Sequence, residues 1–261
     1  MDLGLEGKVA LITGGSDGLG RATALGLARE GCAVVICARR PGPLEAAATE
    51  ITRQGGQALA VPADVSRAEQ VQALFAAARQ RYGRLDILVN NAGTSAALPF
   101  EEADDDLWQQ DLELKLFGAI RCIRAAAPLM RAQGGGRIVN VLNTGAKAPG
   151  ARSLPTAASR AAGLALTKAL SREYAPHNIL VNALCIGIVE SGQWERRWER
   201  EGRPGTLEEY YARMARERGI PLGRVAAATE LADLVLFLVS ERARYITGTA
   251  INFDGGLAAV T

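Results

Sequence analysis

Histidine is almost absent from this sequence, since His177 is the only one among 261 residues. It follows Pro176 at the end of an expected helix, and we interpret it as a surface residue that caps the helix rather than as a catalytic base. A single histidine gives little support to a Ser-His-Asp triad or to a metal site built from several histidines. We therefore expect the function to need no metal ion.

Cysteine is also scarce, with four in the whole chain. They are widely spaced and stand in apolar surroundings: Cys32, Cys37, Cys122 and Cys185. This distribution is typical of buried free thiols in a reducing compartment, because disulfide frameworks and zinc sites use characteristic cysteine spacings. We predict neither a disulfide nor a cysteine metal site.

Long apolar runs and blocks of one charge are missing as well. No stretch approaches the roughly 20 apolar residues of a membrane-spanning helix. The start, MDLGLEGKVALITGG, lacks the basic region and long apolar segment of a signal peptide. Lys and Arg total 30 against 28 Asp and Glu, and the two signs alternate, which favours neither nucleic acid nor a membrane surface as partner. We expect a soluble, cytoplasmic protein that acts on a small molecule.

What the sequence does contain is an alternation of short β-branched runs with alanine-rich segments of helical periodicity. The expected strands cover residues 8–13, 33–38, 58–64, 85–93, 137–143, 179–186 and 247–256. The expected helices cover residues 18–31, 44–54, 65–82, 104–131 and 155–174, with Ser66 as the N-cap of the third. Nearly unbroken apolar strands are typical of a parallel sheet covered by helices on both faces. We predict a single α/β domain, a doubly wound (Rossmann) sheet of seven strands.

A glycine-rich turn, TGGSDGLG at residues 13–20, follows the first strand and opens the first helix. Glycines let the backbone approach a pyrophosphate closely, and the helix N-terminus offers it free N–H groups and the positive end of the helix dipole. Glycine alone is weak evidence, because tight turns use it anyway. The strand–turn–helix context favours a nucleotide site.

The spacing T-G-x-x-x-G-x-G in this turn resembles the short-chain dehydrogenase/reductase family. NNAG at residues 90–93, REYAPHNILVNAL at residues 172–184 and ITGTAINFDGG near the end are similar to further parts of that family, so the resemblance covers essentially the whole chain. It implies a nicotinamide dinucleotide as cofactor. The residues that it places along the cofactor are Gly14, Ser16, Asp17, Gly18, Leu19, Gly20, Arg39, Arg40, Asp64, Val65, Asn91, Ala92, Gly93, Arg160, Gly187 and Val189.

The end of the second expected strand distinguishes the two nicotinamide dinucleotides. Members that bind NAD carry an acidic residue there, which accepts from the ribose 2′-hydroxyl. This chain has Ala38 followed by Arg39 and Arg40, and arginine suits a 2′-phosphate through charge-assisted hydrogen bonds. We therefore predict NADP(H). A solvated basic loop is the other interpretation, and NAD remains an alternative because Asp17 stands where a basic residue of the turn would support NADP.

The family exchanges a hydride with carbonyls or alcohols through a Tyr-x-x-x-Lys pair, a serine on the preceding loop and an asparagine on the long helix before it. All four positions differ in this chain. By resemblance, Thr156 takes the tyrosine position, Arg160 the lysine position, Asn143 the serine position and Lys115 the asparagine position. No tyrosine lies between Tyr82 and Tyr174, so a small shift of the alignment does not restore the phenol.

These four residues predict a changed chemistry. A threonine hydroxyl is too weak an acid to replace a phenol beside a cation, and arginine does not release a proton. Thr156 and Asn143 can still hydrogen-bond a carbonyl or carboxylate, and Arg160 can keep the ribose contact. Lys115 is the one side chain of the four that can titrate near neutral pH, because a neighbouring guanidinium lowers its pKa.

Three functions remain open. The first is an oxidoreductase on an unidentified carbonyl or alcohol, with a proton from Lys115, from water or from a lid residue such as Tyr210 or Tyr211. The second is another reaction, on an anionic substrate, because Lys115 and Arg160 would make the pocket cationic. The third is a catalytically silent nucleotide-binding subunit or sensor, paired with an active relative. Alternatively, Lys115 and Arg160 both extend to solvent and form no site.

Residues 190–219 stand where the family keeps its mobile substrate lid, and they carry seven Glu and seven Arg. Trp194 and Trp198 are four residues apart and would share a helical face. They either cover an apolar substrate or pack on the domain and a neighbouring subunit, and we favour packing. The resemblance also implies a homodimer or homotetramer that pairs through the fourth and fifth helices.

Overall fold

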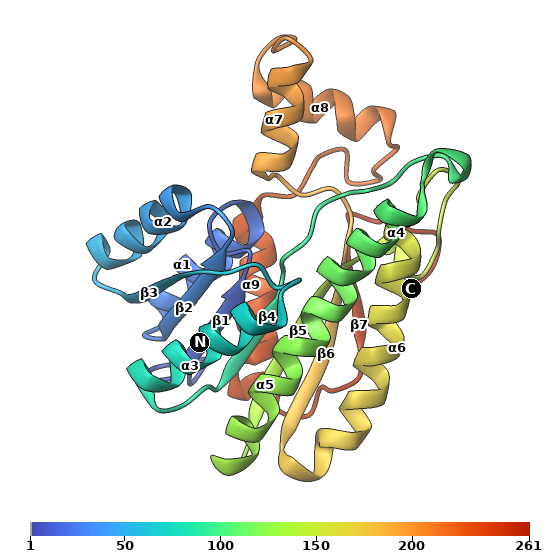
Figure 1. Cartoon of the computed structure of the whole chain (residues 1–261). Helices are drawn as coiled ribbons and strands as arrows, with labels where there is room; N and C mark the ends of the chain where they lie inside the picture. Colours follow the sequence, from blue (N-terminus) through green and yellow to red (C-terminus); the bar gives the residue numbers. More distant parts are fainter. Residues whose placement is uncertain (1) are drawn as a thin grey trace.

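Seven parallel strands form one sheet in the computed structural model, which describes residues 2–261 (Figure 1). The strands are β1 (Val9–Thr13), β2 (Ala33–Ala38), β3 (Gln57–Pro62), β4 (Ile87–Asn90), β5 (Gly136–Asn143), β6 (Ile179–Ile186) and β7 (Ala250–Phe253). Their order is β3-β2-β1-β4-β5-β6-β7, and every neighbouring pair is parallel. The order reverses between β1 and β4, as in a doubly wound sheet, so the predicted fold class is confirmed.

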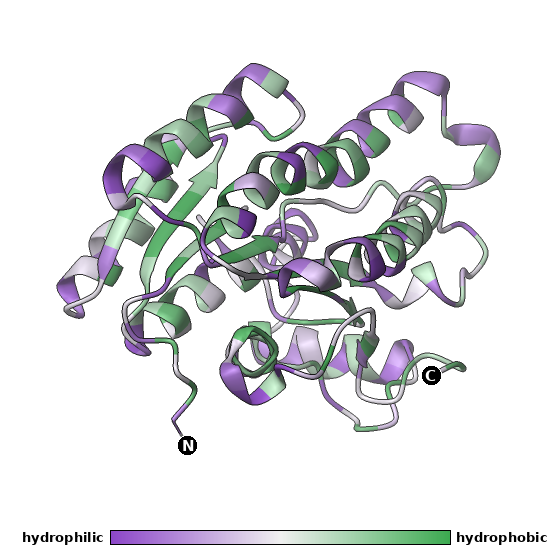
Figure 2. Ribbon diagram, turned by 90° about the horizontal axis from the view of Figure 1, so that it is seen from below, coloured by the Kyte–Doolittle hydropathy of each residue, from purple (hydrophilic) through white to green (hydrophobic). Residues whose placement is uncertain are grey.

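Helices cover both faces of the sheet. They are α1 (Gly18–Arg29), α2 (Pro41–Arg53), α3 (Ala68–Tyr82), α4 (Asp105–Leu112), α5 (Gly118–Ala132), α6 (Thr156–Tyr174), α7 (Gly192–Arg200), α8 (Leu207–Glu217) and α9 (Ala228–Val239). Buried residues of α1, α2 and α9 form one apolar core, and those of α3 and α5 with the end of α6 form the other. Strand β1 serves both cores, because Ala10 and Ile12 point into the first and Val9 and Leu11 into the second. In Figure 2 the strands are accordingly mostly green, between helices banded in purple and green.

Several general properties of the chain are visible in the fold. All four cysteines are free and buried, as predicted. None of the helices between residues 2 and 261 is long and apolar enough to cross a membrane. The same residues bring together no group of three or more His, Cys, Asp or Glu side chains that could hold a metal ion.

Two local predictions are wrong. Ser66 is not a helix cap, because its backbone N–H and its hydroxyl both donate to the Asp64 carboxylate, and α3 begins later, at Ala68. The stretch predicted as one helix over residues 104–131 is interrupted by a π-helical turn at Glu113–Phe117, between α4 and α5. Such turns occur mostly singly inside longer helices, and often at functional sites.

Helix α9 is missing from the sequence prediction. It is apolar around most of its circumference, and Leu231, Val235 and Leu238 pack in the same core as α1. A helix that is buried on most sides lacks the polar face by which helical periodicity is recognised.

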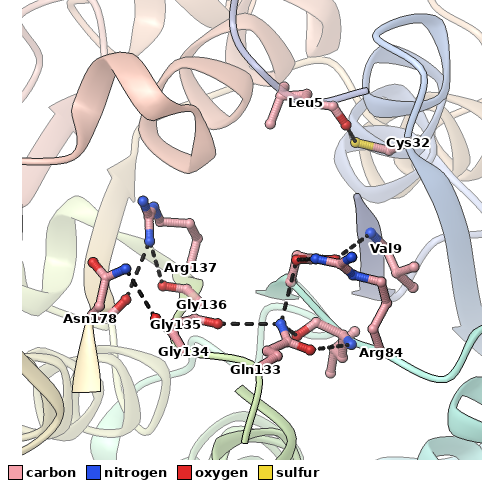
Figure 3. Close-up of polar contacts among 12 residues, drawn as sticks. Leu5, Val9, Cys32, Arg84, Gln133, Gly134, Gly135, Gly136, Arg137 and Asn178 are labelled. Atoms are coloured by element: carbon pink, nitrogen blue, oxygen red, sulfur yellow. Dashed lines mark hydrogen bonds and ion pairs between the residues drawn. The ribbon is translucent and has the colours of Figure 1, made fainter. Parts of the chain in front are cut away.

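A polar network closes the amino ends of the central strands (Figure 3). The Asp86 carboxylate, just before β4, accepts a hydrogen bond from the backbone N–H of Val9 at 2.9 Å and two from the Arg84 guanidinium at 2.6 and 2.9 Å. The Gln133 side chain, just after α5, donates to the Leu85 carbonyl at 2.7 Å. These contacts fix the ends of β1, β4 and α5 against one another. The opposite edge, at the carboxyl ends of the strands, is where ligands bind in sheets of this kind.

Candidate active site

An open cleft with a volume of about 650 Å³ lies at the carboxyl ends of the strands. Of the residues predicted along the cofactor, those that line it are Gly14, Ser16, Asp17, Gly18, Leu19, Arg39, Arg40, Asp64, Val65, Asn91, Ala92, Gly93, Arg160, Gly187 and Val189. Gly20 does not line it. A side chain at Gly20 would collide with the Gly14 carbonyl and the Asn91 amide, so this glycine lets α1 pack closely against the turn that precedes it.

The glycine-rich turn presents the N-terminus of α1 to the cleft. Gly14 and Gly18 have φ values of +68° and +48°, in the left-handed region that favours glycine. Asp17 caps the helix by accepting from the Gly18 N–H at 2.8 Å. The Asn91 side chain donates to the Thr13 carbonyl at 3.0 Å and so holds the loop after β4 against the turn. Free N–H groups at this helix end suit a phosphate.

Two arginines stand at the rim of the cleft beyond β2. Arg39 and Arg40 are exposed and line it, together with Asp64 and Val65 beyond β3. Within residues 2–261, neither guanidinium forms an ion pair. Their positive charge is therefore free to meet an anionic group of a ligand.

Lys115 and Thr156 meet beside the cleft, although they are far apart in the sequence. Lys115 Nζ donates to Thr156 Oγ1 at 2.9 Å and pairs with the carboxylate of Asp111, one helical turn earlier. The side chains of Lys115 and Asp111 have exposed fractions of only 0% and 1%. The alternative in which Lys115 extends to solvent is therefore wrong.

Arg160 and Asn143 complete the set of four predicted positions. Arg160 is partly buried, and its guanidinium donates to the Val141 carbonyl of β5 at 2.8 Å and lies against Gly93. Asn143, at the end of β5, has a buried side-chain oxygen to which no group within residues 2–261 donates. Both side chains line the cleft, as Thr156 does. A buried acceptor without a partner is free to receive a donor group of a ligand.

The surroundings of Lys115 change its acidity. The pKa of the Lys115 ammonium is lowered to about 8. Burial is the largest cause, the charge of Arg160 acts in the same direction, and the hydrogen bond and charge of Asp111 oppose both. Burial also lowers the pKa of Arg160, to about 10, so its guanidinium stays charged at neutral pH. The predicted direction for Lys115 agrees with the structure, but burial is a larger cause than Arg160. A lysine with this pKa can hold or release a proton near neutral pH.

Two members of this cluster were not predicted from the sequence. Asp111 pairs with Lys115, and its second carboxylate oxygen accepts from Ser159 Oγ at 2.6 Å. An aspartate four residues before a lysine on an expected helix is a known pairing signal, and it would have identified Asp111. Ser159 has no such signal, because its role depends on α6 crossing α4.

The predicted lid consists of α7 and α8, which project from one end of the sheet (Figure 1). Trp194 and Trp198 of α7 pack in an apolar cluster with Tyr210 and Tyr211 of α8. Trp194 also lines the cleft. Both tryptophans thus pack between α7 and α8, and Trp194 also borders the cleft in which a ligand would lie.

Helix α7 contacts both walls of the cleft. On one side, Arg196 pairs with Asp17 of the glycine-rich turn at 2.9 Å. On the other side, the Gln193 side-chain oxygen accepts from the Ser95 N–H, beyond β4, at 3.4 Å. Neither Arg196 nor Gln193 was predicted, since the contacts depend on how the lid folds back.

Comparison with known proteins identifies the family. The family described as short chain dehydrogenase matches residues 8–202. This chain belongs to the short-chain dehydrogenase/reductase family. One member, the 3-oxoacyl acyl-carrier-protein reductase FabG of Thermotoga maritima, is 34% identical over 254 residues, which cover 97% of this chain and 98% of the relative.

Solved structures of oxidoreductases with NADPH superpose on nearly the whole chain. L-Sorbose reductase from Gluconobacter frateurii, complexed with NADPH and L-sorbose, has a TM-score of 0.95 at 36% identity, with 100% of both chains covered. A short-chain oxidoreductase from Pseudomonas aeruginosa PAO1, bound to NADPH and described as containing an atypical catalytic center, has a TM-score of 0.91 at 38% identity, with 97% of this chain and 98% of that chain covered. This member of the short-chain dehydrogenase/reductase family therefore shares its architecture with NADPH-bound oxidoreductases.

Proposed function

We propose that this protein is an NADPH-dependent carbonyl reductase with an atypical active site, in which Lys115 replaces the usual acid of the short-chain dehydrogenase/reductase family. The observation that carries the proposal is the hydrogen bond between Lys115 Nζ and Thr156 Oγ1, 2.9 Å long, at the border of the cleft. An ammonium whose pKa is lowered to about 8 is an acid suited to the neutral range. Lys115 thus supplies the acidity that the threonine hydroxyl lacks.

The residues of the cleft fit NADPH. Gly14 and Gly18 place no side chain of their own between the backbone of the turn and the cleft at the N-terminus of α1, which suits a pyrophosphate. Arg39 and Arg40 bring unpaired positive charge that suits a 2′-phosphate. The NADPH complexes of the relatives from Gluconobacter frateurii and Pseudomonas aeruginosa support this assignment. When bound, the dinucleotide supplies a hydride, and the side chains of this chain hold the substrate and the proton.

The remaining positions take binding roles. Thr156 and Asn143 line the cleft, and each has a hydrogen-bond donor for the substrate oxygen. Arg160 lies where the family resemblance places the lysine that contacts the nicotinamide ribose, and we assign it that contact. Because its guanidinium stays protonated at neutral pH, Arg160 takes no part in proton transfer. The charge of Lys115 is compensated by Asp111, whereas Arg160 lines the cleft, so Arg160 favours a substrate with negative charge near its carbonyl.

A buried ion pair argues for catalysis over a silent nucleotide-binding subunit. Burying two charges is expensive, and apolar replacements of a buried pair are often neutral or stabilising. Lys115 and Asp111 thus give little stability in return, while Lys115 donates to the hydroxyl of Thr156, a residue that lines the cleft. The description of the Pseudomonas aeruginosa relative as containing an atypical catalytic center supports an oxidoreductase without the usual residues.

We further infer that α7 and α8 form a substrate lid, because Trp194 and Gln193 border the cleft. A homodimer or homotetramer is inferred from the family resemblance. Phe117, next to α5, is 42% exposed. Pairing through the fourth and fifth expected helices, at residues 104–131 and 155–174, would cover it. Light scattering of the purified protein tests the assembly.

The first experiment is a fluorescence titration of the purified protein with NADPH, followed by NADPH oxidation with a panel of ketones, aldehydes, hydroxyketones and 3-oxoacyl thioesters. We expect binding and turnover of at least one class. Lys115→Met should retain NADPH binding and lose about 10²- to 10⁴-fold in kcat. The matched control is Lys168→Met, because Lys168 is an exposed residue of α6 away from the cleft. Binding without turnover would favour a silent subunit, and absence of binding would reject both.

A further inference from the structure

Lys115 is sealed off from the cleft. Its side chain has no exposed surface, and it lines a separate small cavity beside Asn90, Asn140 and Cys122. Thr156 does line the cleft, and its Oγ1 lies 2.9 Å from Lys115 Nζ. Of the two side chains to which Lys115 Nζ donates, Asp111 and Thr156, Thr156 is the one that lines the cleft, so its hydroxyl connects Lys115 to a ligand bound there.

The hydrogen bonds of Thr156 leave one direction open for its own proton. Its oxygen accepts from Lys115 Nζ and from the backbone N–H of Ala96, each at 2.9 Å. A hydroxyl has two acceptor positions and one O–H donor. Both acceptor positions are filled, and within residues 2–261 no acceptor takes the proton. Because Thr156 lines the cleft, its O–H is free for a ligand bound there.

Asp111 and Ser159 hold Lys115 in place. One carboxylate oxygen of Asp111 pairs with Lys115, and the other accepts from Ser159 Oγ at 2.6 Å. Asp111 comes from α4, and Arg160 faces Lys115 from α6 with like charge. The side chains that β4 and β5 contribute to the small cavity are all neutral. Among the charged neighbours of Lys115, the Asp111 carboxylate thus raises its pKa and the Arg160 guanidinium lowers it.

We propose that Thr156 relays a proton from Lys115 to the substrate carbonyl, with Asp111 as the positioning residue. The relay rests on the proposed carbonyl reduction. As the carbonyl carbon accepts hydride from the reduced nicotinamide, the electron pair of its C=O π bond moves to oxygen, which takes the Thr156 hydroxyl proton. At the same time a Lys115 N–H bond breaks and its proton moves to Thr156 Oγ1. An alcohol, an intact threonine and a neutral lysine result.

The relay removes the difficulty of threonine as an acid. Thr156 gains one proton while it loses another, so its hydroxyl is never ionised, and the acidity that matters is that of Lys115. After the alcohol leaves, water in the cleft returns a proton to Lys115 along the same path. Alcohol oxidation runs in the opposite direction and requires a neutral Lys115.

The decisive variants differ only in the hydroxyl. Thr156→Val keeps the shape of the side chain but has no relay, and it should lose about 10²- to 10⁴-fold in kcat, as Lys115→Met does. Thr156→Ser restores a hydroxyl and should recover activity to within tenfold of wild type. The double variant Lys115→Met/Thr156→Val should be no slower than either single variant, because both break one path. NADPH binding, measured by fluorescence, should change little in all of them.

The outcomes separate the relay from the proposed function. A wild-type protein that reduces no carbonyl overturns the proposed function and the relay with it. A wild type that is active, with Thr156→Val equally active, overturns the relay alone. So do losses that multiply in the double variant, because independent roles add in free energy.

The positioning role of Asp111 has a different readout. Since Asp111 raises the pKa of Lys115, Asp111→Asn should move the alkaline limb of the kcat profile to lower pH. The carbon-13 resonance of the Lys115 side chain, in lysine-labelled protein, should titrate with the same shift and needs no turnover. If Asp111→Asn does not fold, Ser159→Ala is the second variant. It removes the 2.6 Å hydrogen bond to Asp111 and the 3.1 Å hydrogen bond to the Thr156 carbonyl but keeps the carboxylate, and it should show a smaller effect. An unmoved limb and an unmoved resonance would reject the positioning role.

Discussion

Replacing Lys115 alone should destabilise the protein much more than replacing Lys115 and Asp111 together. With exposed fractions of 0% and 1%, the two side chains depend on each other for charge compensation. Removing one partner of a buried pair costs about 3–5 kcal/mol. The 2.6 Å bond from Ser159 and the charge of Arg160 still stabilise Asp111, so we expect the lower end for Lys115→Met, about 3 kcal/mol.

The double replacement Lys115→Met/Asp111→Leu exchanges the pair for apolar side chains of similar size. Such exchanges are neutral or stabilising by about 1–4 kcal/mol. The hydroxyls of Thr156 and Ser159 then each lose a partner, at about 1 kcal/mol apiece. We therefore expect the double variant to lie within about 2 kcal/mol of wild type, so that the coupling between the two positions is favourable and large.

Urea unfolding at neutral pH, followed by circular dichroism, measures the cycle of wild type, two single variants and the double variant. The four free energies of unfolding are comparable only if their slopes with urea concentration are the same in all four proteins. A loss of about 3 kcal/mol from a typical stability of about 5–15 kcal/mol leaves Lys115→Met folded, as the kinetic tests require. If Lys115→Met is as stable as Lys168→Met, or if the single effects simply add, the two groups are not a buried charged pair.

Three further predictions follow from the site. The rate of carbonyl reduction should fall as the pH rises above about 8, because Lys115 loses its proton there, while the rate of alcohol oxidation should rise. Initial rates measured in both directions against pH test this, and parallel profiles would contradict it. Replacing Arg39 and Arg40 by alanine should weaken NADPH binding about 10- to 100-fold and leave NADH binding unchanged, because a hydrogen bond to a charged group contributes roughly 1.5–3 kcal/mol; fluorescence titrations that show equal weakening of both would reject a 2′-phosphate site. Gly20→Ala should lower the free energy of unfolding by about 1–3 kcal/mol, because the added methyl group overpacks against the glycine-rich turn. Gly42→Ala, which has open space around its Cβ, should change the free energy of unfolding by less than about 0.5 kcal/mol. Equal urea midpoints for the two variants would contradict the close packing at Gly20.

Local sequence patterns predict most of the sheet. Strands β2 and β6 begin and end where the apolar runs do, because a strand buried on both faces carries no polar interruption. Asp64 and Ser66 show the limit of such patterns. A serine before an expected helix predicts a cap, but its hydroxyl found a nearer acceptor in the Asp64 carboxylate.

The site was predictable in its parts and not in its connections. Lys115 and Thr156 were recognised as changed positions because the spacing of neighbouring motifs locates them. That Lys115 is buried, and that Thr156 stands between it and the cleft, depends on how the π-helical turn after α4 packs against α6. Contacts between elements distant in the sequence are set by tertiary packing, so Ser159 carries no local signal.

The π-helical turn at Glu113–Phe117 separates the rotation of α4 from that of α5. A π turn holds about one residue more than an α turn, which turns everything before it by roughly 100° relative to an unbroken helix. Helix α5 is anchored by Cys122 and Ile123 in the core, so a one-residue deletion within the turn would rotate α4 and carry Asp111 away from Ser159. The alignment of the proton path is thus adjusted by the length of one helical turn, independently of the core on which the fold depends.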